Sequence, residues 1–244
     1  MTTTDLAAYY DRLEARTGMR ETRQRSYALL DAPAGATIVD IGCGAGHAAA
    51  ELAALGYRPI GVDVNAEALD IARQRLPGHD FHLSSADALP LADGSVHGYR
   101  AVRVLHYLAD VAAVLREAHR VLASGRRAVL VGHDNGMAAV DCGLPQSERI
   151  VRAAETYPAS AGRHFRTLLL DAGFTDVSVR VHTEVMTDHA EMSTSLGNMA
   201  RAAVTANACT QAEADEWLAD LAERDRRDRF LIAWPRVFAV GTRA

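Results

Sequence analysis

The stretch Ile38–His47, with the sequence Ile-Val-Asp-Ile-Gly-Cys-Gly-Ala-Gly-His, decides the fold. Three of its first four residues are apolar, a Gly-x-Gly-x-Gly turn follows, and the Ala-rich run Ala48–Leu52 comes next. This order predicts a strand, a tight glycine loop and a helix. Glycine permits positive φ angles and lets a ligand approach the backbone closely. Several classes of nucleotide-binding protein use such loops, so the neighbouring residues have to discriminate among them.

Two residues beside the loop favour S-adenosylmethionine (SAM) over a dinucleotide. Asp40 lies two residues before the first glycine, and His47 stands where a nicotinamide-binding loop would have its third glycine. A pyrophosphate gains nothing from a nearby carboxylate. SAM carries no phosphate, and Asp40 could meet its cationic amino-acid moiety through the loop or a water molecule.

Two further acids follow predicted strands. In Ile60–Asn65, Asp63 lies 21 residues after Gly42, where a carboxylate can accept both ribose hydroxyls. In Ser85–Leu91, Asp87 follows a third strand, where it can accept the adenine amino group. The ribose-binding acid alone would suit a nicotinamide enzyme equally well.

Taken together, these motifs resemble the class I SAM-dependent methyltransferases, and the match in spacing runs from about Thr37 to His133. The resemblance implies an α/β fold with a Rossmann-like, doubly wound, seven-stranded sheet that is mostly parallel with an antiparallel last strand, plus helical cap insertions. It also implies SAM as the cofactor. The residues expected at the cofactor are Asp40, Gly42, Cys43, Gly44, Asp63, Val64, Asp87 and Ala88.

The alternation of strand and helix patterns agrees with this fold, because alternating elements form a parallel sheet with ligands at the carboxyl ends of the strands. We expect one domain over residues 1–244, with a helical lid at 1–31 and helical caps at 136–162 and 188–228. Strands are expected at Thr37–Ile41, Arg58–Asp63, Asp80–Leu83, His97–Val102, Arg127–Gly132, Val177–Val185 and Phe230–Gly241. Helices are expected at His47–Leu55, Ala66–Leu76, Val111–Leu122, Ser147–Tyr157, Arg163–Ala172, Asp188–Ala206 and Gln211–Arg226.

Methyl transfer from a sulfonium is an in-line displacement that needs orientation, desolvation and, for a protonated acceptor, a base. His106 is a candidate base, because the segment Gly98–Leu108 resembles the fourth-strand region of small-molecule methyltransferases and imidazole titrates near neutral pH. A structural histidine at a helix start is an equal alternative. His133 followed by Asp134 is a second candidate, as a base with its orienting acid, as a substrate-binding pair, or as a polar loop.

Three further residues are candidates for cofactor contact. Arg103 ends a buried strand, and a buried guanidinium needs an anionic partner. The SAM carboxylate or an acidic substrate would serve, and so would Asp134 or Asp40. The segment with Tyr9 and Tyr10, followed by Asp11, resembles the N-terminal helix that folds over SAM in this family, although either tyrosine could simply belong to the core. Arg25 precedes the first strand and could reach the SAM carboxylate, although a solvated arginine is the preferred interpretation.

Composition narrows the remaining choices. The net charge is −5, and all 26 basic residues are arginine, so lysine chemistry is absent. The arginines are interleaved with acids, which argues against a nucleic-acid partner and favours a small-molecule acceptor. No apolar run is long enough for a membrane span, and no metal-ligand spacing occurs. Three dispersed cysteines and a start without signal-peptide features predict a cytoplasmic protein.

The sequence thus predicts methyl transfer to oxygen, nitrogen or carbon of a small organic molecule, most simply in secondary metabolism. It is compatible with a homodimer. Two alternatives stay open. One is a SAM-binding protein that catalyses a reaction other than methyl transfer, such as a pericyclic ring formation. The other is an NAD(P)-dependent oxidoreductase, although without lysine no Tyr-x-x-x-Lys pair can form.

Overall fold

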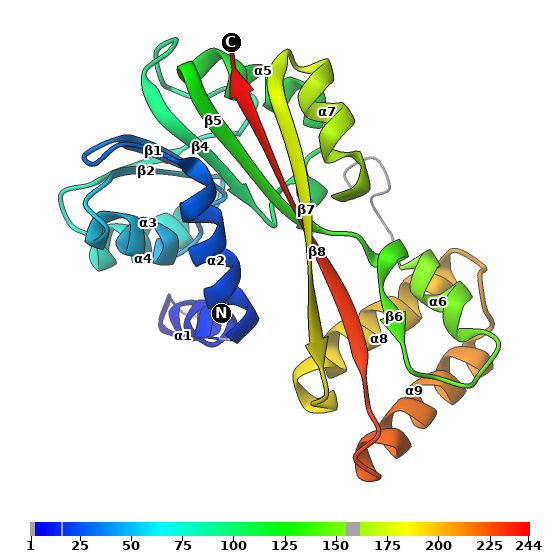
Figure 1. Cartoon of the computed structure of the whole chain (residues 1–244). Coiled ribbons are helices and arrows are strands. Elements are labelled where there is room, and N and C mark those ends of the chain that lie inside the picture. The colour runs from blue at the N-terminus through cyan, green and yellow to red at the C-terminus, as the bar shows by residue number, and fades with distance from the viewer. Residues whose placement is uncertain (1–2, 16, 155–161) are drawn as a thin grey trace. The chain divides into compact units, whose positions relative to one another are not determined.

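A computed structural model describes residues 3–15, 17–154 and 162–244 of the chain (Figure 1). The chain divides into two compact units. The first unit contains Met1–Gly132, His164–Arg180 and Phe238–Ala244, and the second contains His133–Arg163 and Val181–Val237. The expected single domain over residues 1–244 stays a prediction.

The first unit begins with two helices, α1 (Thr3–Ala15) and α2 (Thr17–Leu30). They occupy the segment expected to form a helical lid. The chain leaves α2 at Asp31, which has a φ of 47°. A turn follows and leads into the first strand.

The sheet of the first unit forms where apolar runs alternate with amphipathic helices. Its parallel strands are β1 (Thr37–Ile41), β2 (Arg58–Asp63), β3 (Asp80–Leu83), β4 (Val96–Val102) and β5 (Leu122–His133). The helices between them are α3 (His47–Ala54), α4 (Ala66–Arg75) and α5 (Val111–Val121). A short 3₁₀ helix, η1 (Leu105–Tyr107), follows β4. Figure 1 shows α3 and α4 side by side against the β1–β2 part of the sheet.

The strand order is β3-β2-β1-β4-β5-β8-β6, with β7 paired to β8. Here β6 is Ala139–Val140, β7 is Phe174–Met186 and β8 is Ile232–Arg243. The crossover from β3 to β4 creates the reversal point at β1 and β4, where ligands bind in such sheets. The expected Rossmann-like, mostly parallel sheet with an antiparallel C-terminal part is therefore confirmed.

Over the described residues the sheet has eight strands, whereas the sequence predicts seven. The additional strand is β6, which pairs antiparallel with β8 through Ala139↔Ala233 and Val140↔Ile232. A strand of two residues carries no periodic pattern, so only its pairing with a distant segment defines it.

The core of the first unit lies between the central strands and the helices. Ile38 and Val129 are fully buried and pack with Leu30 of α2 and Leu52 of α3. Helix α7 (Phe165–Asp171), preceded by the 3₁₀ turn η4 (Gly162–His164), contributes the buried Phe165. Apolar burial of this kind supplies most of the stabilisation of a domain of this size.

The second unit is mainly helical and has a core of its own. It contains η2 (Asn135–Met137), α6 (Ser147–Ala153), α8 (His189–Thr205) and α9 (Gln211–Arg226). Trp217 is fully buried in this core, and its indole N–H donates to Ser147 Oγ at 2.9 Å. These helices lie in the expected cap segments. Residues 155–161, where the helix from Ser147 was expected to end at Tyr157, lie outside the described residues.

Within the described ranges, none of the helices has the length and apolar character needed to cross a bilayer.

Candidate functional site

A cavity of about 720 Å³ lies within the first unit, at the carboxyl ends of β1, β2 and β4 and beneath α1 and α2. This is the edge of the sheet at which a ligand is expected. Its polar wall comes from the glycine loop and the ends of β2 and β3. Among the residues that line it are the predicted Tyr10, Asp40, Gly42, Cys43, Gly44, Asp63, Val64, Asp87 and Arg103.

The glycine loop and the acid after β2 form one hydrogen-bonded unit. Gly42 N and Cys43 N both donate to Val62 O, at 2.8 and 3.2 Å. Gly44 N donates to Asp63 Oδ2 at 2.8 Å, and Asn65 N donates to Asp63 Oδ1 at 2.9 Å. These bonds orient the Asp63 carboxylate at the rim of the cavity and leave lone pairs on both oxygens for a ligand.

Two glycines of the loop are required by their surroundings. Gly42 and Gly44 have φ angles of 65° and 50°, which are unfavourable for other residues. A Cβ atom at Gly42 would lie 2.3 Å from Val104 Cγ2, and one at Gly44 would lie 3.0 Å from Tyr10 Cε1. The loop is therefore packed on one side against the turn after β4 and on the other against α1.

Asp40 lines the cavity, but its charge is compensated from within the protein. Its carboxylate forms an ion pair with Arg100 of β4, and Arg100 Nε also donates to Ser26 Oγ at 2.8 Å. Burial raises the pKa of Asp40, and Arg100 opposes this rise. Arg100 therefore already compensates the charge of Asp40, and contact of Asp40 with the amino-acid moiety of SAM through the loop or a water molecule stays a prediction.

Helices α1 and α2 form the wall opposite the strands. The Tyr10 ring lies against Gly44, and burial together with the charge of Asp63 raises the pKa of its hydroxyl. Tyr9 packs edge-on against Tyr10, with ring centroids 5.7 Å apart.

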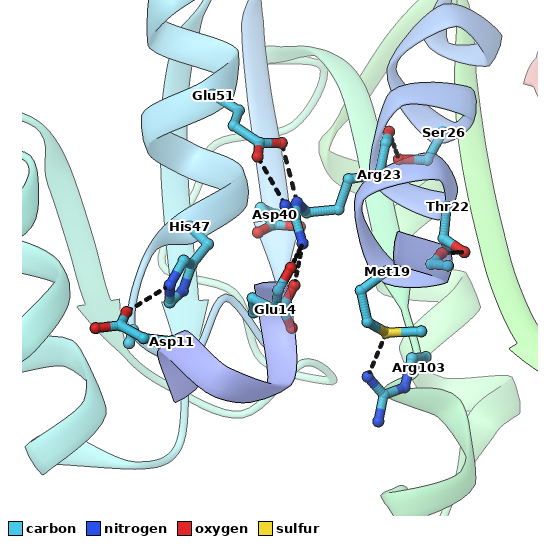
Figure 2. Close-up of polar contacts among 12 residues, drawn as sticks. Asp11, Glu14, Met19, Thr22, Arg23, Ser26, Asp40, His47, Glu51 and Arg103 are labelled. Atoms are coloured by element: carbon cyan, nitrogen blue, oxygen red, sulfur yellow. Dashed lines mark hydrogen bonds and ion pairs between the residues drawn. The ribbon is translucent and has the colours of Figure 1, made fainter. Parts of the chain in front are cut away.

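Arg23, and not Arg25, lies at the cavity. Arg25 is half exposed, pairs with Glu21 one turn away and does not line the cavity, so its contact with the cofactor stays a prediction that this placement does not support. Arg23 bonds to Glu14 of α1 and donates to Glu51 of α3 through Nε and Nη2, at 2.9 and 2.8 Å (Figure 2). On a helix, residues two positions apart face different directions, which separates these two arginines.

Arg103 follows β4 with a left-handed backbone, at a φ of 59°. A left-handed conformation at a non-glycine residue costs free energy and is found preferentially at functional sites. Its side chain lines the cavity, with Nη1 2.8 Å from Met19 Sδ (Figure 2). Asp40 is held by Arg100 and Asp134 by Arg163, so neither acid serves as the ion-pair partner considered for Arg103.

The candidate base His106 is not among the residues that line the cavity. Its ring stacks at 3.9 Å, between centroids, on Tyr107, which is 72% exposed and does line the cavity. Burial and the charge of Arg103 lower the pKa of His106 to about 4. Its imidazole is therefore neutral near pH 7 but weakly basic.

His133 and Asp134 belong to the second unit and also do not line the cavity. Asp134 is fully buried, and its carboxylate accepts three N–H groups of Arg163, from the backbone at 3.0 Å, from Nε at 2.6 Å and from Nη2. The His133 ring lies 5.9 Å from the Trp234 ring. The expected pairing of Asp134 with His133 is therefore replaced by pairing with Arg163.

The remaining predicted contact, Ala88, is exposed and lies outside the lining, where its carbonyl accepts from Ser84 Oγ at 2.7 Å. Sequence reasoning missed Arg23, Arg100 and Tyr107. An arginine inside the apolar run of β4 was the one available signal for Arg100, because such a charge requires a buried acid. Over the described ranges, no group of three or more His, Cys, Asp or Glu side chains is arranged to hold a metal ion.

Comparisons with known proteins agree with this geometry. A family model described as a methyltransferase domain matches residues 39–130. An uncharacterized 37.1 kDa protein in transposon TN4556 of Streptomyces fradiae is 33% identical over 233 residues, which cover 89% of this chain and 67% of that protein. The O-methyltransferase cnsE of Penicillium expansum is 30% identical over 171 residues, which cover 66% of this chain and 60% of that enzyme.

Solved structures share the fold at low identity. The YcgJ protein of Bacillus subtilis matches with a TM-score of 0.63 and 16% identity, covering 92% of this chain and 98% of that one. A phosphoethanolamine N-methyltransferase of Haemonchus contortus in complex with SAM matches with a TM-score of 0.63 and 16% identity, covering 99% of this chain and 57% of that one.

The chain therefore belongs to the class I SAM-dependent methyltransferases, and SAM is its cofactor. The alternative of an NAD(P)-dependent oxidoreductase is wrong. Matches to the relatives named as methyltransferases cover only 39–64% of the length of those proteins.

Proposed function

We propose that this chain transfers the methyl group of SAM to an oxygen, nitrogen or carbon atom of a small organic acceptor in secondary metabolism. The observation that carries this proposal is the cavity of about 720 Å³. Its volume falls in the range of roughly 300–1,000 Å³ that small-molecule sites occupy. Its two walls differ in chemistry, as a site for a charged cofactor and a less polar acceptor requires.

The polar wall fits SAM. Asp63 and Asp87 both line the cavity, which supports assigning Asp63 to the ribose hydroxyls and Asp87, after β3, to the adenine amino group. Carboxylates also favour a cation, and the reacting sulfur of SAM is a sulfonium. Gly42 and Gly44 allow the backbone to approach the ligand closely.

The opposite wall fits an organic acceptor. Tyr9, Leu13, Met19, Tyr107 and Leu108 contribute aromatic and apolar surface to the same cavity. Tyr107 is exposed, so its ring is available to a ligand. The net charge of −5 disfavours a polyanionic nucleic acid as the acceptor.

Among acceptor atoms, oxygen has the most support. Relatives from Penicillium expansum and Aspergillus sclerotiorum that are 30% identical to this chain carry the name O-methyltransferase. Nitrogen and carbon remain alternatives.

We infer that orientation and exclusion of water supply most of the catalysis. SAM, when bound, supplies an electrophilic methyl group. The one histidine that lines the cavity, His47, already bonds to Asp11 and Arg75. Burial and the charge of Asp63 raise the pKa of Tyr10, which moves it further from neutral pH, so its protonated hydroxyl can donate a hydrogen bond. An acceptor that ionises readily, such as a phenol or a carboxylic acid, suits a site of this kind.

The proposal is tested by incubating the purified protein with SAM and a panel of phenols, carboxylic acids and amines. We expect S-adenosylhomocysteine (SAH) and a product that is heavier by one methylene group. Conversion of an acceptor without SAH formation would favour the alternative of a SAM-binding protein that catalyses a reaction without methyl transfer. Absence of any product across the panel, with SAM bound, would count against a small organic acceptor.

A further inference from the structure

Helix α1 has little apolar surface with which to hold its place over the cavity. Leu6 is its one fully buried residue among Asp5–Ala15, and it packs in a small cluster with Ala45 and Ile71. A helix of 13 residues is marginal in water by itself. Ala7 and Tyr10 add partly buried apolar contacts to this cluster, and the position of α1 depends on polar contacts as well.

One of these contacts is a closed network of Asp11, His47 and Arg75, which we call the Asp11 network. His47 Nε2 lies 2.8 Å from Asp11 Oδ1, and Arg75 Nη2 donates to the same oxygen at 2.6 Å. Arg75 Nη1 lies 2.7 Å from His47 Nδ1 and also donates to Ala45 O at 2.6 Å. The network thus joins α1 to the glycine loop, to the start of α3 and to the end of α4.

The chemistry of the network defines the state of His47. An arginine N–H can only donate, so Nδ1 of His47 accepts, and its proton is on Nε2, where it donates to Asp11. Burial and the neighbouring Arg75 lower the pKa of His47, and Asp11 opposes this shift. The neutral imidazole is the form that satisfies all three residues.

Glu14 makes a second attachment one turn further along α1. It pairs with Arg23, which in turn bonds to Glu51 of α3. Asp11 and Glu14 lie on one face of α1, and His47 and Glu51 lie on one face of α3. Figure 2 shows the contact of His47 with Asp11 and the contacts of Arg23 with Glu14 and Glu51. The ring of Tyr10, beside Asp11, is thereby kept against Gly44.

We propose that Asp11, His47 and Arg75 are positioning residues that hold α1 closed over the cofactor cavity and set how long SAM stays bound. This inference rests on the proposed use of the cavity as the SAM site. Asp11 and Arg75 do not need to touch the cofactor, because they act through α1 and Tyr10. Partly exposed ion pairs contribute modestly, so each of these variants should change the release rate by about 1.5- to fivefold.

The test measures the release of isotope-labelled SAM, chased with excess SAH, from the wild type and from Asp11→Asn, Arg75→Ala and the double variant. We expect each single variant to release SAM about 1.5 to five times faster. The double variant should be no faster than the faster single one, because both changes break one network. Arg75→Lys keeps the positive charge but not the planar guanidinium group, which donates to several acceptors at once. Its SAM release rate should lie between those of the wild type and Arg75→Ala.

Arg152→Ala is the matched control, since it removes an exposed ion pair within α6, which does not line the cavity. Hydrogen exchange should accelerate in residues 3–15 of the variants while β1 keeps its protection. Wild-type release rates and unchanged exchange in α1 would overturn the proposal, and so would a loss of global thermal stability without faster release. Because the readout is SAM binding, failure to find an acceptor would contradict the proposed function and leave this result standing.

Discussion

Asp40 and Arg100 form an ion pair inside the sheet, across the neighbouring strands β1 and β4. Their side chains are 2% and 4% exposed, and the two residues are register partners in the parallel ladder. Ser26 of α2 accepts a further hydrogen bond from Arg100, and the guanidinium carbon lies 5.3 Å from the centre of the Tyr27 ring. The pair connects the floor of the cavity to the helix that covers it.

Breaking this pair should be costly, because it leaves one buried charge without compensation. We expect Arg100→Met to lower the free energy of unfolding by about 3–5 kcal/mol. The double variant Asp40→Asn/Arg100→Met should recover part of that loss, since it buries no unpaired charge. Urea unfolding at neutral pH measures both. A double variant that is less stable than Arg100→Met would contradict this explanation.

Gly42 in the glycine loop and Gly35 before β1 allow the effect of backbone strain to be separated from that of a steric clash. Gly42→Ala and Gly35→Ala both place a side chain at positive φ, at 65° and 74°. A Cβ at Gly35 meets nothing within 4 Å, whereas one at Gly42 meets Val104 Cγ2. We expect about 1–2 kcal/mol of destabilisation for Gly35→Ala and a further 1–3 kcal/mol or so for Gly42→Ala. Thermal unfolding and SAM calorimetry should show loss of SAM affinity for Gly42→Ala only.

Asp63 should dominate the affinity for the ribose of SAM. Hydrogen bonds to a charged group contribute about 1.5–3 kcal/mol, so Asp63→Ala should weaken SAM binding by roughly 10- to 150-fold. Asp63→Asn, which keeps an acceptor oxygen, should lose less. Calorimetry with SAM gives the affinities, and NAD is the control ligand that we expect not to bind. Equal affinity in wild type and Asp63→Ala would remove Asp63 from the cofactor site.

His106 should make the stability of the protein depend on pH below neutrality. In the unfolded chain its pKa is about 6.5. In the folded chain its pKa is about 4. The unfolded state therefore binds more protons between these values, and the contribution of His106, present above about pH 6.5, is lost as the pH falls toward 4. Wild type should lose more stability over this range than His106→Asn, as urea midpoints would show; parallel pH profiles would contradict the lowered pKa.

The sequence alone determined the elements whose signals are local. The bounds of β1, β2 and β3 agree with those expected, and two of these strands have a local end signal, since β1 stops before Gly42 and β2 ends at Asp63. The glycine loop and Asp63 could be placed together for the same reason, since both follow parallel strands and such strand ends share one edge of the sheet. Where strands and helices alternate regularly, the spacing of residues along the chain is sufficient to predict which strand ends lie together.

Tertiary structure alone decided which charged groups meet. Asp40 was recognisable as an unusual acid, but its partner Arg100 lies 60 positions away and is brought to it by strand register. Arg23 lines the cavity and Arg25 does not, because the two residues lie on different faces of α2. After β4, Tyr107 lines the cavity, where the sequence predicts His106. Asp134 pairs with Arg163, and β6 exists only through β8. The energy of a buried charge or of a two-residue strand depends on partners that are distant in sequence. The local sequence pattern therefore does not predict these contacts.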